Sequence, residues 1–338
     1  MLDTIRSALT ELFASGGRQV LGIFLAPGST YSLGALAASL VLFLLLALPQ
    51  RRGLRFAVLM RALFPRRIWC SASGRTDLAY FMLGILLAGT MIGWAIVSAE
   101  QVRALVADAL GPAPERSLPG WAGAAIATPL LFLAYEFAYW LDHWLMHRVP
   151  LLWRFHKVHH QAESLSLFTN GRVHPVETIG FYNLLALVMG LTAALLDRLL
   201  GAAQPWTIGG TNALIMLSAV TITHLQHSHL WFGFGPRWGR VLLGPAHHQI
   251  HHSADPAHFN RNLGSSLALF DRLFGSFHMP ETQRERLKFG VEDGERNPHG
   301  LRAALFAPLL PPIDRLWLRG DQQAAVRHPV GDAIGPMA

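Results

Sequence analysis

The sequence W-R-F-H-K-V-H-H at 153–160 is followed further along the chain by P-A-H-H-Q-I-H-H-S at 245–253, and these two stretches decide the expected fold. Both contain the spacing H-x-x-H-H. On a helix, side chains three or four positions apart lie on one face, so each stretch is expected to deliver its imidazoles to one point. Neutral imidazole is the commonest nitrogen ligand of zinc, copper, iron and nickel. Each stretch is therefore predicted to belong to a metal site.

Histidine is concentrated around these two stretches. The chain has 17 histidines, of which 13 lie between residues 143 and 252. A third group reads H-x-x-x-H at 143–147, and a looser pair occupies positions 224 and 227. Together these imidazoles exceed what one ion can hold. The pattern favours two metal ions that share one nest of nitrogens.

The composition is that of a membrane protein. Of the 338 residues, 51% are hydrophobic and 14% are charged, whereas soluble domains carry roughly 25% charged residues. A helix that crosses the hydrocarbon core of a bilayer needs about 20 apolar residues. The candidate spans are 31–49, 78–99, 121–141, 178–196 and 206–223.

An arginine-rich segment predicts how the chain is oriented. Seven arginines lie between residues 51 and 75, and the nearest acid is Asp77. Such an excess marks the cytoplasmic side of a membrane, and counting crossings from it puts all the histidine groups on that face. The net charge of +7 is attributed to cytoplasmic loops that face anionic lipid headgroups. No pattern in the sequence suggests nucleic-acid binding. We predict an inner or cell membrane protein with a cytoplasmic metal site.

Four carboxylates lie near the histidine groups in the sequence. Glu136 is inside a candidate span, nearly two helical turns before His143, so it shares a face with that residue. Because a carboxylate at membrane depth is costly, it usually has a function. Glu136 is predicted either to hydrogen-bond a ligating imidazole or to make a polar contact between helices. Asp142, Glu177 and Asp271 are the other candidates.

Eight sequence features follow one another along the chain: D-H-W-L-M-H at 142–147, H-x-x-H-H at 156–160, R-V-H-P-V-E at 172–177, H-S-H at 227–229, G-P-R-W at 235–238, H-x-x-H-H at 248–252, N-L-G at 262–264 and F-D-R-L-F-G-S-F at 270–277. In these features and their order the chain resembles the membrane-bound fatty acid hydroxylase / sterol desaturase superfamily, over roughly 123–278. Phe270 stands where the family usually has tryptophan, which is a conservative exchange.

The resemblance implies an all-α polytopic membrane protein, with four to five transmembrane helices and a helical cytoplasmic cap that carries a histidine-rich di-metal site. Residues 1–120 are expected to form an N-terminal membrane region with two spans and a basic cytoplasmic loop. Residues 121–280 are expected to form the catalytic domain. Residues 281–338 are expected to form a cytoplasmic tail, with an interfacial helix near 301–318.

The resemblance also implies a pair of iron ions that activates O2 and oxidises a C–H bond of a membrane lipid. Its implied ligands are His143, His147, His156, His159, His160, His227, His248, His251 and His252, with His224 as a further candidate. His174 is expected to orient a neighbour, and ligation by His229 or His247 is left open. The sequence contains no dinucleotide fingerprint, flavin motif or cysteine cluster, and Cys70 is its one cysteine. An external ferredoxin or cytochrome-type donor with its reductase is therefore expected to dock on the basic face.

Several alternatives stay open. Hydroxylation, desaturation and ether-bond cleavage share the first hydrogen abstraction, so the motifs do not separate a hydroxylase from a desaturase or an ether-lipid monooxygenase. Imidazole also binds zinc tightly, so a purified sample could carry zinc as an artefact. A zinc-dependent membrane hydrolase is a further alternative, although the sequence contains no H-E-x-x-H motif. A metal transporter would place its ligands on several spans near the bilayer midplane. We predict a lipid hydroxylase.

Overall fold

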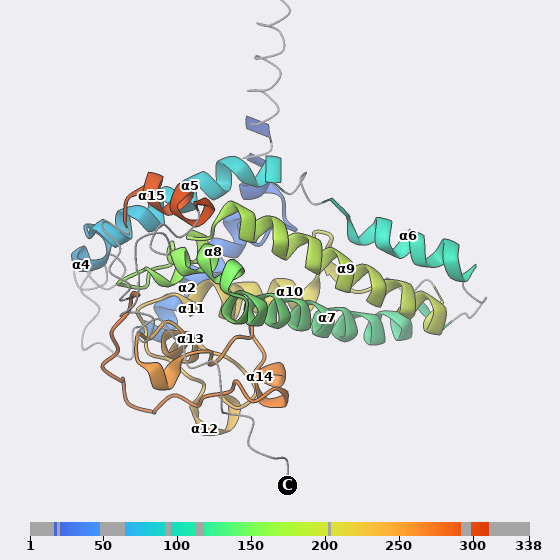
Figure 1. Ribbon diagram of the computed structural model, residues 1–338. Coiled ribbons are helices and arrows are strands. Elements are labelled where there is room, and N and C mark those ends of the chain that lie inside the picture. The colour runs from blue at the N-terminus through green and yellow to red at the C-terminus, as the bar shows by residue number, and fades with distance from the viewer. Residues whose placement is uncertain are drawn as a thin grey trace, which may run out of the picture.

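The computed structural model describes residues 17–18, 21–47, 65–91, 96–111, 118–201, 204–291 and 299–310 (Figure 1). Within these residues the protein is mostly helical, as predicted. The main helices are α2 (Leu33–Ala47), α4 (Arg66–Trp69), α5 (Ala72–Met91), α6 (Ala99–Leu110), α7 (Gly120–Arg148), α8 (Pro150–His160) and α9 (Pro175–Leu200). The later, shorter helices are α10 (Ala213–Ser218), α11 (His224–Gln226), α12 (Gly235–Trp238), α13 (Pro245–His251), α14 (Leu269–Leu273) and α15 (Leu301–Phe306).

Two long helices, α7 and α9, lie side by side through the middle of the molecule (Figure 1). They have 29 and 26 residues, and within the described parts of the chain they are the two helices long and apolar enough to cross a membrane. They contain the predicted spans 121–141 and 178–196. Helix α2 and the run Ala213–Gln226 are shorter apolar helices.

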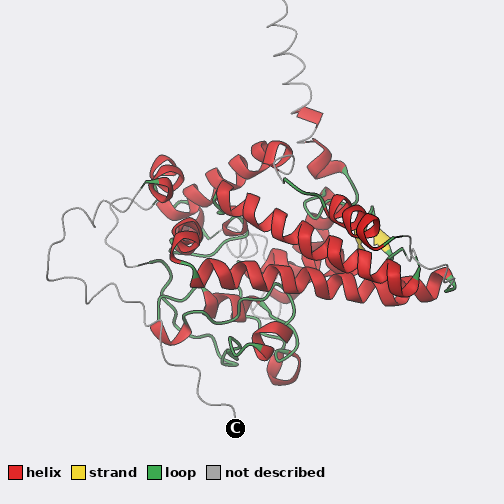
Figure 2. Ribbon diagram, turned by 45° about the vertical axis from the view of Figure 1, so that its right-hand side comes forward, coloured by secondary structure: helices red, strands yellow, loops and turns green. Residues whose placement is uncertain are grey.

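The predicted span at 206–223 is wrong in its first half. Strands β1 (Thr207–Ile208) and β2 (Thr211–Asn212) form an antiparallel hairpin there, and the helical run begins only at Ala213 (Figure 2). Gly209 and Gly210 both have positive φ, at 59° and 91°, which suits a two-residue hairpin turn. Asn212 then caps α10 by accepting hydrogen bonds from the backbone N–H groups of Leu214 and Ile215.

The predicted span at 78–99 is also shifted. Helix α5 begins at Ala72, so it includes Arg75 and Asp77, and it is described as far as Met91. A separate helix, α6, begins at Ala99, where Ser98 and Gln101 form a capping box. The uncharged run misplaced the start of this helix because Asp77 is paired with a buried arginine inside α5 rather than exposed at a helix terminus.

A sharp corner between α7 and α8 brings histidines of the two helices together. Pro150 occupies the first position of α8, and Val149 before it is extended, as residues before proline usually are. The corner folds α8 back onto the end of α7, and the two helices pack together. The chain then reaches α9, α11 and α13, which surround the same end of α7 (Figure 1).

The C-terminal segment packs on the N-terminal part of the chain. Helix α15 lies against α5, and His174 Nε2 is 3.0 Å from the Leu305 carbonyl oxygen. The interfacial helix predicted near 301–318 corresponds to α15 and a 3₁₀ turn at Ala307–Leu309, and its remainder lies outside the described residues.

Candidate metal centre

Among the residues that the structure describes, nine histidines form two adjacent groups at the end of α7. The five-histidine group consists of His143, His147, His156, His160 and His251. The four-histidine group consists of His159, His227, His248 and His252. Within each group the ligand nitrogens all lie within 4.8 Å of one another, and every ring except the half-buried His147 is buried. Imidazoles from four separate segments therefore converge.

Each H-x-x-H-H sequence is divided between the two groups, which the sequence did not predict. In α8, His156 and His160 enter the five-histidine group while His159 enters the other. In α13 and its C-cap the division is reversed: His248 and His252 belong to the four-histidine group, and His251 belongs to the five. Neighbouring helical residues point about 100° apart, so the last two histidines of each sequence diverge. Each of the two helical segments therefore contributes histidines to both groups, which keeps the groups adjacent.

The imidazole nitrogens point at one another. His227 Nε2 is 3.1 Å from His159 Nε2, 2.8 Å from His248 Nε2 and 3.2 Å from His252 Nε2. His248 and His252 Nε2 are themselves 3.1 Å apart. A neutral ring nitrogen either carries a hydrogen or offers a lone pair, so three mutually adjacent nitrogens cannot all be satisfied by hydrogen bonds. Ligands bound about 2.0–2.1 Å from one ion at right angles lie at about this separation, and the donor set therefore fits a metal.

The five-histidine group has the same character. His156 Nε2 is 3.1 Å from His143 Nε2 and 3.1 Å from His160 Nε2. The His251 ring centroid is 4.5 Å from that of His143 and 4.9 Å from that of His147. The rings of His160 and His252, one from each group, stack 4.6 Å apart. Two ions held this way would be close neighbours.

Backbone carbonyls fix the tautomer of three rings. His143 Nδ1 lies 2.8 Å from the Leu263 oxygen, His251 Nδ1 lies 2.9 Å from the Arg261 oxygen, and His159 Nδ1 lies 3.2 Å from the Arg172 oxygen. A carbonyl oxygen only accepts, so each Nδ1 carries the hydrogen. Each Nε2 is left with a lone pair for a metal, which is the usual arrangement of ligating histidines.

Burial keeps these rings neutral. It lowers the pKa of His159 to about 3, with a smaller contribution from the neighbouring His143. Burial likewise lowers the pKa of His160, His248, His251 and His252 well below the ordinary value of 6.5. At neutral pH the imidazoles therefore offer lone pairs rather than N–H⁺ groups.

The carboxylate candidates support the groups in two ways. Glu177, in the first turn of α9, lies with Oε1 2.7 Å from His156 Nδ1, as an outer partner of a ligand does. Glu136 Oε2 accepts hydrogen bonds from the backbone N–H groups of Ser266 (3.0 Å) and Leu267 (2.9 Å). Asp271 accepts from the N–H groups of Leu263 and Gly264, both at 2.8 Å. Glu136 and Asp271 thus hold the loop whose Leu263 carbonyl orients His143.

The remaining histidine candidates lie outside both groups. His224 Nδ1 is 2.9 Å from Ser39 Oγ, and its ring packs against Tyr31. His174 is the N-cap of α9, where its Nδ1 accepts from the Val176 N–H at 3.1 Å. It therefore positions the helix that carries Glu177. His247 accepts from the Gly244 N–H at 3.1 Å, and the ring of His229 packs against Phe43.

A cavity of about 300 Å³ opens onto the metal centre. It reaches His143 and His156 of one group, His159 and His227 of the other, and the half-buried Asp142. Its walls are largely apolar and come mainly from α5, α7 and α9, with Ile23, Tyr31 and the segment 170–173 completing them. The wall from α5 consists of Tyr80, Phe81, Leu83, Gly84, Ile85 and Leu87. The sequence did not indicate this wall, because it depends on how α5 packs on a distant part of the chain.

The chain is similar in sequence to several proteins that are named as lipid hydroxylases, monooxygenases or desaturases. The chain is 27% identical over 172 residues to alkylglycerol monooxygenase of Xenopus tropicalis, a match that covers 48% of this chain and 32% of that protein. It is 34% identical over 148 residues to an ornithine lipid hydroxylase of Rhizobium tropici, covering 43% and 40%. It is 27% identical over 160 residues to a Delta(7)-sterol 5(6)-desaturase of Gibberella zeae, covering 45% and 38%.

These matches span between 32% and 40% of the length of the three relatives. No solved structure matches the chain. The segment 128–276 matches the fatty acid hydroxylase family, which confirms the resemblance seen in the sequence motifs. The segment 128–276 that is similar to the fatty acid hydroxylase family contains all nine histidines of the two groups.

Proposed function

We propose that this protein is an O2-dependent di-iron lipid oxygenase, which hydroxylates a C–H bond of a fatty acyl, sterol or related membrane lipid. The observation that carries the proposal is the pair of buried histidine groups at the end of an apolar cavity. The names of the relatives support it, because they include a monooxygenase, a lipid hydroxylase and a sterol desaturase.

In this proposal the nine grouped histidines hold two iron ions, one in each group. Bound iron would supply the O2 activation that an unactivated C–H bond requires, and the protein supplies position and surroundings. The carbonyl contacts at Nδ1 keep the Nε2 lone pairs of His143, His159 and His251 directed inward. Glu177 holds His156. The apolar cavity excludes water and brings a lipid chain beside both groups.

We further propose that the enzyme is an integral protein of the inner or cell membrane, with the histidine groups on the cytoplasmic face. Helices α7 and α9 would cross the bilayer, with α2, α5 and the run Ala213–Gln226 completing four to five spans. The arginines between residues 51 and 75 favour this orientation. Residues 121–280 would form the catalytic domain, between a membrane region and a C-terminal tail.

Two electrons must reach the site for each O2 consumed. We propose that a separate ferredoxin or cytochrome-type protein, with its reductase, supplies them at the basic face. The same centre also suits a lipid desaturase or an ether-lipid monooxygenase, because abstraction of one hydrogen begins all three reactions. The sterol desaturase and the alkylglycerol monooxygenase among the relatives support keeping these alternatives.

Lipid analysis under isotopically labelled O2 tests the proposed function. Membranes that contain the protein and a donor system are expected to accumulate a lipid that has gained one labelled oxygen atom. A lipid that has lost two hydrogens would instead identify a desaturase. Label that enters from water and not from O2, or no oxidised lipid with a range of acyl and sterol substrates, would contradict the proposal.

Gly84 is expected to set the length of lipid that the cavity accepts. A Cβ atom at Gly84 would meet no atom within 4 Å, so Gly84→Leu should fold and project its side chain into open space. The variant is expected to shift the substrate preference toward shorter or slimmer lipids by about tenfold, because a methyl or larger group displaces substrate from an apolar pocket. Competition between acyl chains of different length measures this shift.

Gly180→Leu is the matched control for this change. Gly180 is also a helical glycine with open space at its Cβ position, but it lies outside the cavity lining. It is expected to leave the preference unchanged. An unaltered preference in Gly84→Leu would show that substrate does not occupy this cavity.

A further inference from the structure

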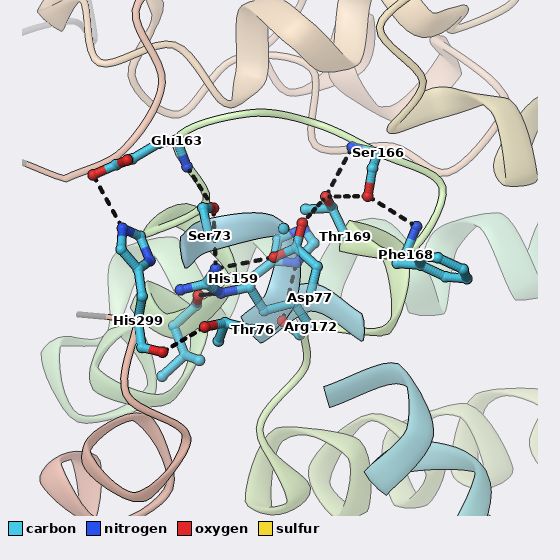
Figure 3. A network of polar contacts seen from close by, with 12 residues as sticks. Ser73, Thr76, Asp77, His159, Glu163, Ser166, Phe168, Thr169, Arg172 and His299 are labelled. Atoms are coloured by element: carbon cyan, nitrogen blue, oxygen red, sulfur yellow. Dashed lines mark hydrogen bonds and ion pairs between the residues drawn. The ribbon is translucent and has the colours of Figure 1, made fainter. Parts of the chain in front are cut away.

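A fully buried ion pair joins α5 to the segment that precedes α9. Arg172 Nη1 lies 2.9 Å from Asp77 Oδ1, and both side chains are 0% exposed. Asp77 comes from α5, which lies outside the family-matching residues 128–276. Figure 3 shows the two side chains at the centre of a network that also includes His159. The pair therefore connects the N-terminal part of the chain to the metal centre.

Both partners of this pair make further hydrogen bonds. Arg172 Nε donates to the Val158 carbonyl at 2.7 Å, and Nη1 also lies 3.4 Å from Ser73 Oγ. Thr169 Oγ1 donates to Asp77 Oδ2 at 2.6 Å, so both carboxylate oxygens are used. The guanidinium is thus held by α5 through Ser73 and Asp77 and by α8 through the Val158 carbonyl.

Arg172 contacts a proposed ligand through its backbone and its side chain. Its carbonyl oxygen lies 3.2 Å from His159 Nδ1 and fixes the tautomer of that ring. Its side chain holds the carbonyl of Val158, the residue just before His159. Movement of Arg172 would therefore change both the hydrogen bond that orients the His159 ring and the peptide that carries it.

The charge of Arg172 also matters at this place. A guanidinium stays protonated in proteins, and here it is removed from water. A positive charge without a partner beside a cation site would oppose metal binding, because buried charges are weakly screened. Asp77 supplies the compensating negative charge at contact distance.

We propose that Asp77 is a positioning residue for the four-histidine group: it fixes Arg172, which in turn orients His159, and it neutralises the arginine charge next to the site. The inference rests on the proposed function in one respect, that this group binds an ion. It makes α5 part of the metal centre as well as a wall of the cavity. In this chain, a helix from outside the family region thereby completes the site.

Metal binding to Asp77→Asn tests the proposal without using activity. The full chain, purified metal-free in detergent, is titrated anaerobically with Co²⁺, and release to a chelator is timed. Wild type is expected to bind two ions. Asp77→Asn is expected to release one of them at least about tenfold faster, the range seen when outer partners of ligands are lost. The other ion should keep its wild-type release rate, because the five-histidine group is unchanged.

Asp197→Asn is the matched control. It breaks a second arginine–aspartate pair between helices, in which Arg103 Nε and Nη2 lie 2.6 and 2.9 Å from Asp197. That pair joins α6 to α9 and involves no histidine of either group. The control is expected to bind and release both ions as wild type does, even if its thermal unfolding midpoint falls.

Asp77→Glu, which has a longer carboxylate side chain, keeps the proposal testable if the Asp77→Asn protein fails to fold. Asp77→Glu keeps the charge but displaces the contact, and it is expected to retain both ions with a several-fold faster release of one. Wild-type release of both ions from either Asp77 variant would overturn the positioning role. Fewer than two ions in the wild type would instead contradict the proposed two-metal function, so the two failures are distinguishable.

Discussion

His159→Ala is expected to lower lipid oxidation by at least about 100-fold and to reduce the bound metal from two ions per chain to one. His159 is the ring that α8 contributes to the four-histidine group, and its Nε2 lies 3.1 Å from His227 Nε2. Without it, three rings remain to hold an ion in a buried pocket. Turnover with the labelled-O2 assay and metal analysis on the same preparation measure both effects.

His224→Ala is the control for the ligand assignment. His224 was a ligand candidate from the sequence, but its ring contacts Ser39 and Tyr31 outside both groups. This variant is expected to keep two ions and most of the turnover. Full activity in His159→Ala, or loss of one ion in His224→Ala, would show that the four-histidine group is assigned wrongly.

The largest loss of stability is expected from Glu136→Ala. Glu136 is fully buried in α7 and accepts from the Ser266 and Leu267 N–H groups and from the Ser266 hydroxyl. Each buried donor left without a partner costs about 1–3 kcal/mol, so the free energy of unfolding should fall by roughly 3 kcal/mol or more. Denaturant unfolding in detergent measures the change. The loop at 263–267 should also loosen, and His143 with it.

Glu136→Gln separates position from charge. Its amide oxygen can accept from the two backbone N–H groups, and its NH2 group can donate to the Ser266 hydroxyl, which also accepts. It is expected to recover most of the stability and the bound metal. Glu100→Ala is the surface control, because that side chain is 79% exposed and its pair with Arg103 contributes at most about 1 kcal/mol. Equal stability of Glu136→Ala and Glu100→Ala would contradict the role given to Glu136.

The local parts of the site could be predicted from the sequence. The spacing of the histidines follows helical geometry, so a convergence of side chains from α7, α8 and α13 was predictable from the period. The division of each H-x-x-H-H sequence between two groups was not predicted. Nine of the ten predicted ligands do converge in the described structure. The helical class and the two longest apolar helices were also predictable, because they depend on the composition of single segments.

The parts that depend on packing between distant segments could not be predicted. His224 is three residues from His227, yet a π-helical stretch at Ala219–Thr223 precedes it and its ring reaches Ser39 instead. The carbonyl groups that contact His143 and His251 lie 120 and 10 residues away in the sequence. Every residue has a backbone carbonyl, so no residue type in the sequence indicates these contacts. Asp77 appeared only as one acid after an arginine-rich segment, whereas its partner Arg172 is 95 residues further along.

Glu136 illustrates how a correct signal can leave its meaning open. A carboxylate inside an apolar helix indicated a role, and two alternatives were predicted: a hydrogen bond to a ligating imidazole or a polar contact between helices. The structure has it bind the loop at 266–267, whose neighbour Leu263 orients His143. Which of the two contacts Glu136 makes depends on a loop 130 residues further along the chain.

Metal analysis of the anaerobically purified wild-type protein, combined with Mössbauer spectroscopy after loading with iron, tests the central claim most directly. Two irons per chain in nitrogen-rich, mutually coupled sites are expected, since two histidine groups adjoin through the stacked rings of His160 and His252. A single ion per chain, or two irons without magnetic coupling, would contradict a shared di-iron centre.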